Sequence, residues 1–219
     1  MTVINTNVSA LRAQNASRMA SNALGTAMER LSSGKRINGA KDDAAGLAIA
    51  TRMDAKVRGL NQAVRNANDG ISMAQTAEGA MSEISNILVR MRELAVQSAN
   101  GTVADSDRTA INAESTALRS QIDDIAGRTD FNGTVLLADQ TISIQTGVDT
   151  GQTVDIDLVV MDDAGLGTDA VDLSTASDAS DALQVLDDAI TLVAEQRANV
   201  GAAQNRLEAT VNNLTSTAT

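Results

Sequence analysis

The stretch ISNILVRMRELAVQSANGT, from Ile84 to Thr102, decides the fold that we predict from the sequence. Apolar residues recur in it at intervals of three and four, as they do along one face of an α-helix. Charged side chains crowd between these apolar residues, and the pair Asn100-Gly101 is a typical helix stop. The sequence therefore predicts a helix that ends near Ala99 and uses its polar face for contacts as well.

The same helix extends back to Ala44, which gives it about 55 residues and a length of ~80 Å. A single compact domain does not need a helix of this length. Its apolar pattern shifts in phase around Glu78 and Gly79, which we interpret as a change of packing partner. In this helix, we expect the following residues in the bundle core: Val57, Leu60, Val64, Ile84, Ile87 and Met91.

Two more helices are predicted after the Asn-Gly stop. A shorter one begins at the acids near Asp105, and a final one holds coiled-coil spacing from Leu183 to Leu214. Arg197 and Gln204 stand at core-type positions, where polar residues lower stability and fix the register. The core residues expected in these two helices are Leu118, Ile122, Leu183, Leu186, Ile190, Val193, Val200, Leu207 and Val211.

Between the helix that begins near Asp105 and the helix that begins near Leu183, the spacing of the apolar residues changes from helical to every second residue. TISIQ and TVDIDLVV alternate apolar with polar residues, so we expect a small β-hairpin region at about 132–161. Asp149-Thr150-Gly151 matches the short signature of aspartic proteases, but between two strands it favours a turn. Asp155 and Asp157, with Asp162 and Asp163 nearby, could hold Ca²⁺, although alternate acids are also the solvated face of a strand.

The fold class that follows is mainly α, a long-helix coiled-coil bundle with a small β-hairpin region. Before the long helix, the segment from about Ile4 to Leu31 forms an Ala-rich helix with few large apolar residues, and a basic loop follows it. We expect two domains. Residues 1–43 form an N-terminal helix with its loop, and residues 44–219 form a helical bundle.

The composition excludes several kinds of site. The chain of 219 residues has no Cys, His, Trp or Tyr and one Phe. Thiol nucleophiles, imidazole bases and the commonest zinc ligands are missing, so we expect no enzyme, no metal and no cofactor. The net charge of -11 argues against a nucleic acid or an anionic membrane as partner. No stretch has the pattern of a signal peptide or a membrane span, which by itself favours the cytoplasm.

Several long motifs resemble those of bacterial flagellin, the subunit of the flagellar filament. In the order of the family they are VINTNVSALRAQNA, RLSSGKRINGAKDDAAGLAIA, LNQAVRNANDGISMAQTAEGAM, VRMRELAVQSANGT, DFNGTVLL and GAAQNRLEATVNNL. The resemblance implies a structural subunit that self-assembles into the filament for motility. It also implies secretion through the flagellar type III export apparatus to the extracellular flagellum, which replaces the cytoplasmic location.

In the family, the two chain termini pair as a coiled coil that lines the channel of the filament. The resemblance therefore implies that residues 1–43 are an inner-core helix with its loop and that residues 44–219 are an outer-tube bundle. The N-terminal helix is expected to order only when subunits meet, because alone it buries too little apolar surface. Its candidates for the filament seam are the large apolar residues Val8, Leu11, Met19, Leu24 and Leu31. Flagellins continue past the TVNNL region with a further helical segment, so we expect a truncated chain that is monomeric.

The long helix from Ala44 to about Ala99 also resembles the segment that the innate flagellin receptor, Toll-like receptor 5, binds. The resemblance implies a receptor interface at Arg90, Leu94 and Glu114, with Arg92, Glu93 and Gln97 beside them. Leu94 would be an apolar anchor between two charges. The alternative is an ion pair between helices around a core leucine. For the whole protein, the alternative function is a cell-surface flagellin-like adhesin or polysaccharide-binding protein, against which the lack of aromatic residues counts.

Overall fold

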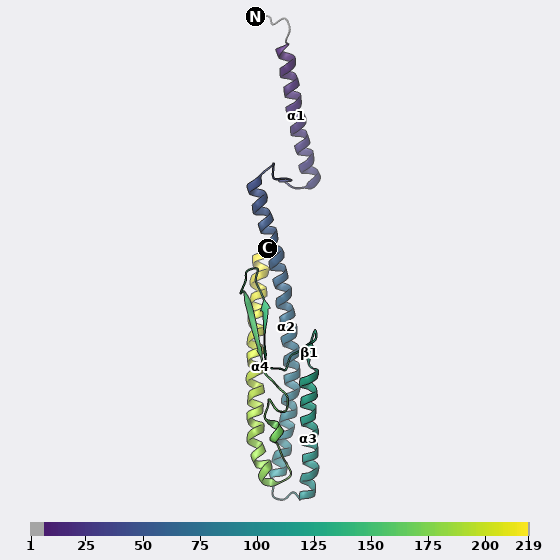
Figure 1. Ribbon diagram of the computed structural model, residues 1–219, viewed down its shortest axis with the longest axis vertical. Coiled ribbons are helices and arrows are strands. Elements are labelled where there is room, and N and C mark those ends of the chain that lie inside the picture. The colour runs from purple at the N-terminus through teal and green to yellow at the C-terminus, as the bar shows by residue number, and fades with distance from the viewer. Residues whose placement is uncertain (1–6, 219) are drawn as a thin grey trace. The chain divides into compact units, whose positions relative to one another are not determined.

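The computed structural model describes residues 7–218, and the chain divides into two compact units between Val57 and Arg58 (Figure 1). The first helix, α1 (Val8–Ser33), lies in the first unit, and the long helix α2 (Ala44–Ala99) continues from one unit into the other. The division therefore falls inside α2 and not after residue 43 as expected. The physical reason is burial, because no described side chain before Leu60 is buried.

The ends of the elements in the first unit follow from capping. The Asn7 side chain accepts hydrogen bonds from the amides of Ser9 and Ala10, both at 3.1 Å, and Gly34 ends α1 with a φ of 66°. The predicted start at Ile4 lies outside the described residues. Asp43 precedes α2, and its Oδ1 accepts from the Gly46 amide at 2.8 Å, which satisfies a free donor of the first turn.

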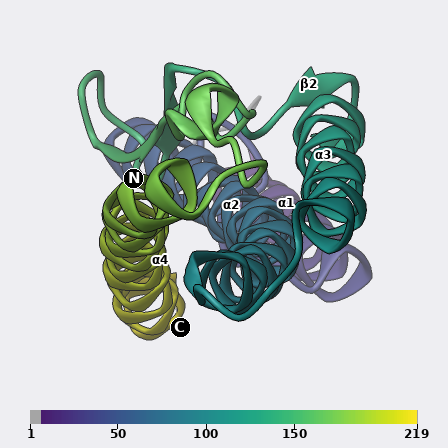
Figure 2. The same ribbon diagram turned by 90° about the horizontal axis from the view of Figure 1, so that it is seen from below.

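The second unit is built from three helices and a β region. α3 (Asp105–Arg128) and α4 (Ala176–Ala218) lie on two sides of α2, as Figure 2 shows in a view along the helices. Both run antiparallel to α2. Arg108 of α3 contacts Asn100 at the end of α2 while Glu114, further along α3, pairs with Arg90. On α4, Asp187 pairs with Arg92 while the later Arg197 pairs with Glu78. The predicted mainly α fold with a small β region is confirmed.

The core seam of α2 is a regular heptad pattern with no shift in phase. The residues that form it are buried, and they alternate at spacings of three and four: Leu60, Ala63, Ala67, Gly70, Ala74, Ala77, Met81, Ile84, Leu88, Met91, Ala95 and Ser98. The predicted slip at Glu78 and Gly79 is wrong. Small residues occupy the core positions between Leu60 and Met81, whereas large residues such as Val57 and Val64 flank the seam, so the apolar pattern of the sequence does not follow the seam there.

The seam of α4 has the same regularity. Its buried positions are Ala179, Ala182, Leu186, Ala189, Val193, Gln196, Val200, Ala203 and Leu207. Arg197 and Gln204 are half-buried at the edge of this seam, where both reach Glu78 of α2, at 3.7 and 3.3 Å. They are not at core positions, because the side chains one residue before them fill the seam.

The expected core residues differ in how far the structure buries them. Those that are buried are Leu60, Ile84, Ile87, Met91, Ile122, Leu186, Val193, Val200 and Leu207. Those that are partly buried, at the edge of the core, are Val64, Leu118, Leu183, Ile190 and Val211. The assignment of Val57 to the core is wrong, since its side chain is 37% exposed. It lies on a stretch of α2 that has no described partner layer.

A close approach of three elements explains Gly70, one of the glycines within α2. A Cβ at Gly70 would come to 3.0 Å from Ile144 of the β region and 3.3 Å from Leu207 of α4. A residue without a side chain lets both neighbours pack against the backbone of α2. The small residues in this half of the helix therefore set the spacing of the bundle.

The β region consists of two hairpins. β1 (Asp130–Phe131) pairs with β2 (Thr134–Val135), and β3 (Gln140–Gln145) pairs antiparallel with β4 (Thr153–Leu158). The first turn contains Asn132 and Gly133 with φ values of 52° and 82°, as a tight hairpin turn requires. The turn between β3 and β4 contains the Asp-Thr-Gly motif with Gly151 at a φ of 82°, so the turn interpretation is confirmed.

The segment after β4 is a structural part of the bundle. Met161, Leu166, Val171 and Leu173 are buried in it. It also contains the short helix η1 (Thr168–Ala170). The Ser98 hydroxyl of α2 donates to the carbonyl of Leu173 at 2.6 Å. With the β3–β4 hairpin, this segment covers α2 between α3 and α4 (Figure 2).

Candidate functional site

The candidate receptor residues divide between two faces of α2. Arg90 donates from Nη2 to Glu114 Oε1 of α3 at 2.8 Å, and from Nη1 to Glu93 Oε2 at 3.0 Å. All three side chains remain about half exposed or more. The hydrogen bonds to Glu114 and Glu93 raise the pKa of Arg90 above its ordinary value, so the guanidinium stays charged. Gln97 is exposed and lies two turns along the same face as Arg90.

Arg92 belongs to the opposite edge of the exposed surface. Its Nε donates to Asp187 Oδ1 of α4 at 2.5 Å, and this hydrogen bond lowers the pKa of Asp187. Arg90 and Arg92 therefore bracket α2, one at the boundary with α3 and one at the boundary with α4. The structure brings Arg90, Glu93 and Glu114 together and separates Arg92 from them.

The expected apolar anchor at Leu94 is wrong. Its side chain is 2% exposed and belongs to the hydrophobic core of the bundle, so no partner can contact it while the bundle is folded. The reason is helical geometry, since Leu94 follows Met91 by three residues and shares its buried face. The alternative interpretation, an ion pair between helices beside a core leucine, describes what the structure shows.

The apolar residues that do reach the surface here are Val89 and Val96. Their side chains are 46% and 51% exposed. They lie two turns apart on the strip between Arg90 and Arg92. Sequence reasoning missed them, although both are out of phase with the seam residues Leu88 and Ala95 that precede them. We call the exposed face of α2 formed by Val89, Arg90, Arg92, Glu93, Val96 and Gln97, together with Glu114 of α3, the central patch.

The candidates for the filament seam are all exposed. The exposed fractions of Val8 and Leu11 are about one half, and those of Met19, Leu24 and Leu31 are higher. Helical spacing places Val8, Leu11 and Met19 on one side of α1, and Leu24 and Leu31 on the opposite side. The described part of α1 contains no buried residue. The helix thus presents two apolar strips and not one.

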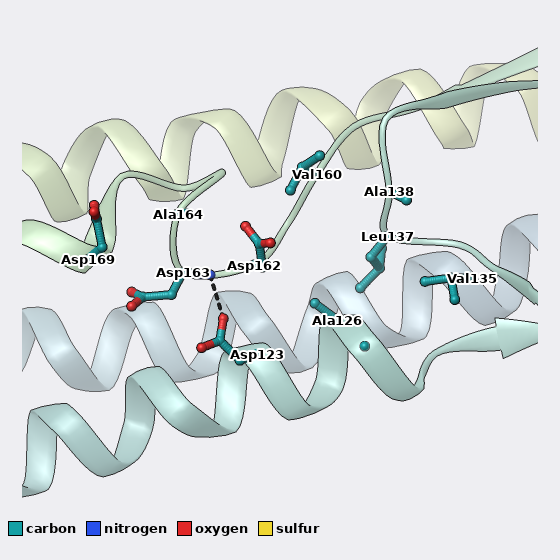
Figure 3. Close-up of a pocket in the computed structure, with 11 residues that line it drawn as sticks. Asp123, Ala126, Val135, Leu137, Ala138, Val160, Asp162, Asp163, Ala164 and Asp169 are labelled. Atoms are coloured by element: carbon teal, nitrogen blue, oxygen red, sulfur yellow. Dashed lines mark hydrogen bonds between the residues drawn. The ribbon is translucent and has the colours of Figure 1, made fainter.

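Carboxylates gather at one cavity of the second unit. It has a volume of about 580 Å³ and lies between α3, the first hairpin and the segment after β4 (Figure 3). Asp123 Oδ1 accepts from the Asp163 amide at 2.8 Å, and Asp162 Oδ1 accepts from the Gly165 amide at 2.7 Å. Asp163 itself is bound by Arg119. These carboxylates thus hold the loop in place.

Two of the acidic residues considered for calcium lie on the surface of the β region. Asp155 and Asp157 lie on the exposed face of β4, between the buried Val154, Ile156 and Leu158. Among residues 7–218 no three carboxylates converge on a point that could hold an ion. In the same described part of the chain, no helix is apolar over a length that could cross a membrane.

Two protein-family models match this chain. The model of the bacterial flagellin N-terminal helical region matches residues 4–141, and that of the C-terminal helical region matches residues 183–219. The phase 2 flagellin of Salmonella typhimurium is 55% identical over 180 residues, which are 82% of this chain and 36% of that protein. A flagellin of Serratia marcescens is 52% identical over 176 residues, which are 80% of this chain and 50% of that protein. The chain thus spans between about a third and a half of the length of these relatives.

Solved structures agree with the sequence comparison. The crystal structure of Bacillus cereus flagellin is similar with a TM-score of 0.63 and 36% identity, over 68% of this chain and 88% of that one. FliC from Burkholderia pseudomallei has a TM-score of 0.59 at 21% identity, over 63% of this chain and 99% of that one, which supports the fold alone. The family models together match well over half of the chain: the chain belongs to the bacterial flagellin family.

Proposed function

We propose that this chain is a structural subunit of an extracellular flagellar filament, that its partners are further copies of flagellin, and that it has no catalytic role. The proposal includes export by the flagellar type III apparatus, as the family resemblance implies. The observation that carries it is α1, a helix with apolar side chains on two sides and no buried residue. Such a helix gains stability only when other helices cover both strips.

Two strips on opposite sides favour a packed assembly over a single pairing. A helix in a two-stranded coiled coil needs one seam. α1 instead exposes Val8, Leu11 and Met19 on one side, and Leu24 with Leu31 on the other. A helix inside a tube of subunits has neighbours on more than one side, and this arrangement accounts for both strips.

Filament assembly tests the proposal. We expect the chain, joined to the C-terminal segment of the Serratia marcescens relative, to form filaments visible by electron microscopy. The double variant Leu24→Ser, Leu31→Ser should abolish them, because it removes one strip of α1 from the contact. Thermal unfolding of the second unit, followed by circular dichroism, should not change.

The matched control is Gln14→Ala, an exposed polar position of the same helix outside both strips. It should form filaments as the unmodified chain does. Filaments from the double variant would contradict the role of the strip. Persistent monomers of the unmodified fusion would instead favour the alternative, a cell-surface adhesin or polysaccharide-binding protein.

The second part of the proposal concerns receptor recognition. The central patch places Val89 and Val96 between charged residues on a rigid helix. Apolar residues with a charged rim are typical of protein–protein interfaces. Arg90 is held in place by Glu114 and Glu93 and still exposes about half of its side chain. This supports Toll-like receptor 5 as a partner, with the two valines in the anchoring role first assigned to Leu94.

Arg90→Asp should weaken activation of receptor-bearing cells about tenfold or more, since loss of an interface hot spot costs about 2 kcal/mol or more. The helical circular dichroism signal should stay the same, because the side chain is exposed. Arg128→Asp makes the same charge change on the exposed end of α3, away from the patch. It should keep full signalling, and equal potency of the two variants would remove Arg90 from the interface.

A further inference from the structure

The chain contains three Asn-Gly pairs, which the fold treats differently. They are Asn38-Gly39 in the loop before α2, Asn100-Gly101 at the end of α2, and Asn132-Gly133 in the first hairpin. In such a pair, the amide nitrogen of the glycine can attack the side-chain carbonyl carbon of the asparagine. Two conditions favour the attack: a glycine amide that has no hydrogen bond, and a carbonyl that is polarised by a donor.

The glycine amides of the first and third pairs are held by carboxylates. Gly39 donates to Asp42 Oδ2 at 3.1 Å, and Gly133 donates to Asp130 Oδ2 at 3.1 Å. Amides of Asn38 and Gly39 together lower the pKa of Asp42, so the carboxylate that holds them is ionised at neutral pH. The Asn38 side chain is held as well, because its Nδ2 donates to the carbonyl of Glu29 at 3.2 Å.

The pair at Asn100-Gly101 has the opposite arrangement. Among the hydrogen bonds of the described residues, none holds the Gly101 amide. The Thr102 amide donates to Asn100 Oδ1 at 3.1 Å, which polarises the carbonyl under attack. Both residues of the pair are exposed, and no atom lies within 4 Å of the place where a Gly101 Cβ would stand. Water and a solvent base therefore reach this pair freely.

We propose that Asn100 is a site of spontaneous deamidation, set apart from the other two Asn-Gly pairs by the fold. The Gly101 amide gives its proton to a solvent base, and its nitrogen bonds to Cγ of Asn100. The bond from Cγ to Nδ2 breaks, and the nitrogen leaves as ammonia. Water then adds to one carbonyl of the cyclic imide and opens it, which leaves an aspartate or an isoaspartate at position 100. The net reaction exchanges an amide and water for a carboxylic acid and ammonia.

The modification affects a structural contact of the bundle. The carbonyl of Asn100 accepts from Arg108 Nη2 at 3.0 Å and from the Val103 amide at 3.1 Å, and Arg108 is 4% exposed. An isoaspartate adds a methylene group to the backbone at this point, which moves that carbonyl. A new carboxylate at the C-terminal end of α2 also meets the negative end of the helix dipole. Of the three Asn-Gly pairs, the one in the turn between α2 and α3 is therefore the first to be modified.

The test uses the unmodified protein and mass spectrometry. Trypsin divides the chain so that Asn38, Asn100 and Asn132 fall in separate peptides, 37–41, 93–108 and 129–197, each with no other asparagine. The folded protein is incubated at mildly alkaline pH and digested at intervals. Asn100 should react about tenfold faster or more than the other two, since a hydrogen bond to a charged group must break at each of them.

Two further measurements separate the fold from the local sequence. In urea, the three pairs should react at similar rates, because the carboxylates no longer hold the glycine amides. In the folded protein, Asp130→Ala should raise the rate at Asn132, and Asp42→Ala should raise the rate at Asn38. Equal rates at the three pairs in the folded protein, the same order in urea, or no gain in either variant would overturn the proposal.

Discussion

Replacing Leu88 with alanine is expected to lower the free energy of unfolding by about 2 to 5 kcal/mol, the range for a fully buried leucine. Leu88 is a seam residue of α2 with no exposed surface, and it lies beside Met91 in the core of the second unit. The truncation removes apolar contacts and leaves a cavity that the long rigid helices close only in part. Urea unfolding followed by circular dichroism measures the change.

The matched control for this variant is the next residue along the chain. Val89 is 46% exposed, so Val89→Ala should change the free energy of unfolding by no more than about 0.5 kcal/mol. A similar loss at both positions would show that the two faces of α2 are equally buried in solution. That result would contradict the assignment of Val89 to an exposed patch.

Replacing Arg119 with methionine is expected to lower the free energy of unfolding by about 2 to 4 kcal/mol at neutral pH. Arg119 Nη2 donates to Asp163 Oδ2 at 2.7 Å, and the two side chains are 22% and 13% exposed. Removing one partner of a fully buried pair costs about 3 to 5 kcal/mol, and the remaining exposure reduces this cost. The pair joins α3 to the segment after β4.

The effect should depend on pH in a defined direction. Burial raises the pKa of Asp163, but hydrogen bonds from Arg119 and Thr168 outweigh it and leave the pKa below its ordinary value. A carboxyl with a lowered pKa in the folded state stabilises the fold above its unfolded-state pKa of about 3.9. The contribution is lost as the pH falls through the folded-state pKa. Unfolding at a series of pH values should therefore show the two proteins converging in acid.

Arg128→Met provides the control, since Arg128 pairs with Asp124 of the same helix at 2.9 Å while both side chains are mostly exposed. A surface pair of this kind contributes about 0 to 1 kcal/mol. Arg128→Met should therefore cost less than about 1 kcal/mol at every pH. An equal cost for the two arginine variants would mean that the segment after β4 is not held by Asp163.

The large apolar residues and the turn residues carried most of what the sequence could predict. Gly34, the Asn100-Gly101 stop and the Asp-Thr-Gly turn mark their boundaries through backbone preferences, which act locally. The period of the strands and of α4 also followed from local alternation. The seam of α2 between Leu60 and Met81 could not be read in this way, because alanine and glycine occupy it and carry little hydrophobic signal.

In the central patch too, the sequence predicted some features, and contacts with distant residues decided the others. The sequence indicated that Arg90 and Glu114 are paired charges, but it assigned Leu94 to the surface and overlooked Val89 and Val96. One position of shift along a helix moves a side chain by more than a quarter of a turn. The choice of face therefore depends on which neighbours pack against the helix, and the sequence does not name them.

By itself, the sequence determined the succession of helices and β region, the end of α2 at Asn100-Gly101, the Asp-Thr-Gly turn and the lack of Cys and His, since each of these depends on residue types and on nearest neighbours. Only the tertiary structure decided which face of α2 is buried, that the segment after β4 belongs to the core, and which Asn-Gly amide is free. These features depend on contacts such as those of Gly70 with Leu207 and of Arg119 with Asp163, which join distant residues. Packing and hydrogen bonding between distant segments select one arrangement among many that the local pattern allows.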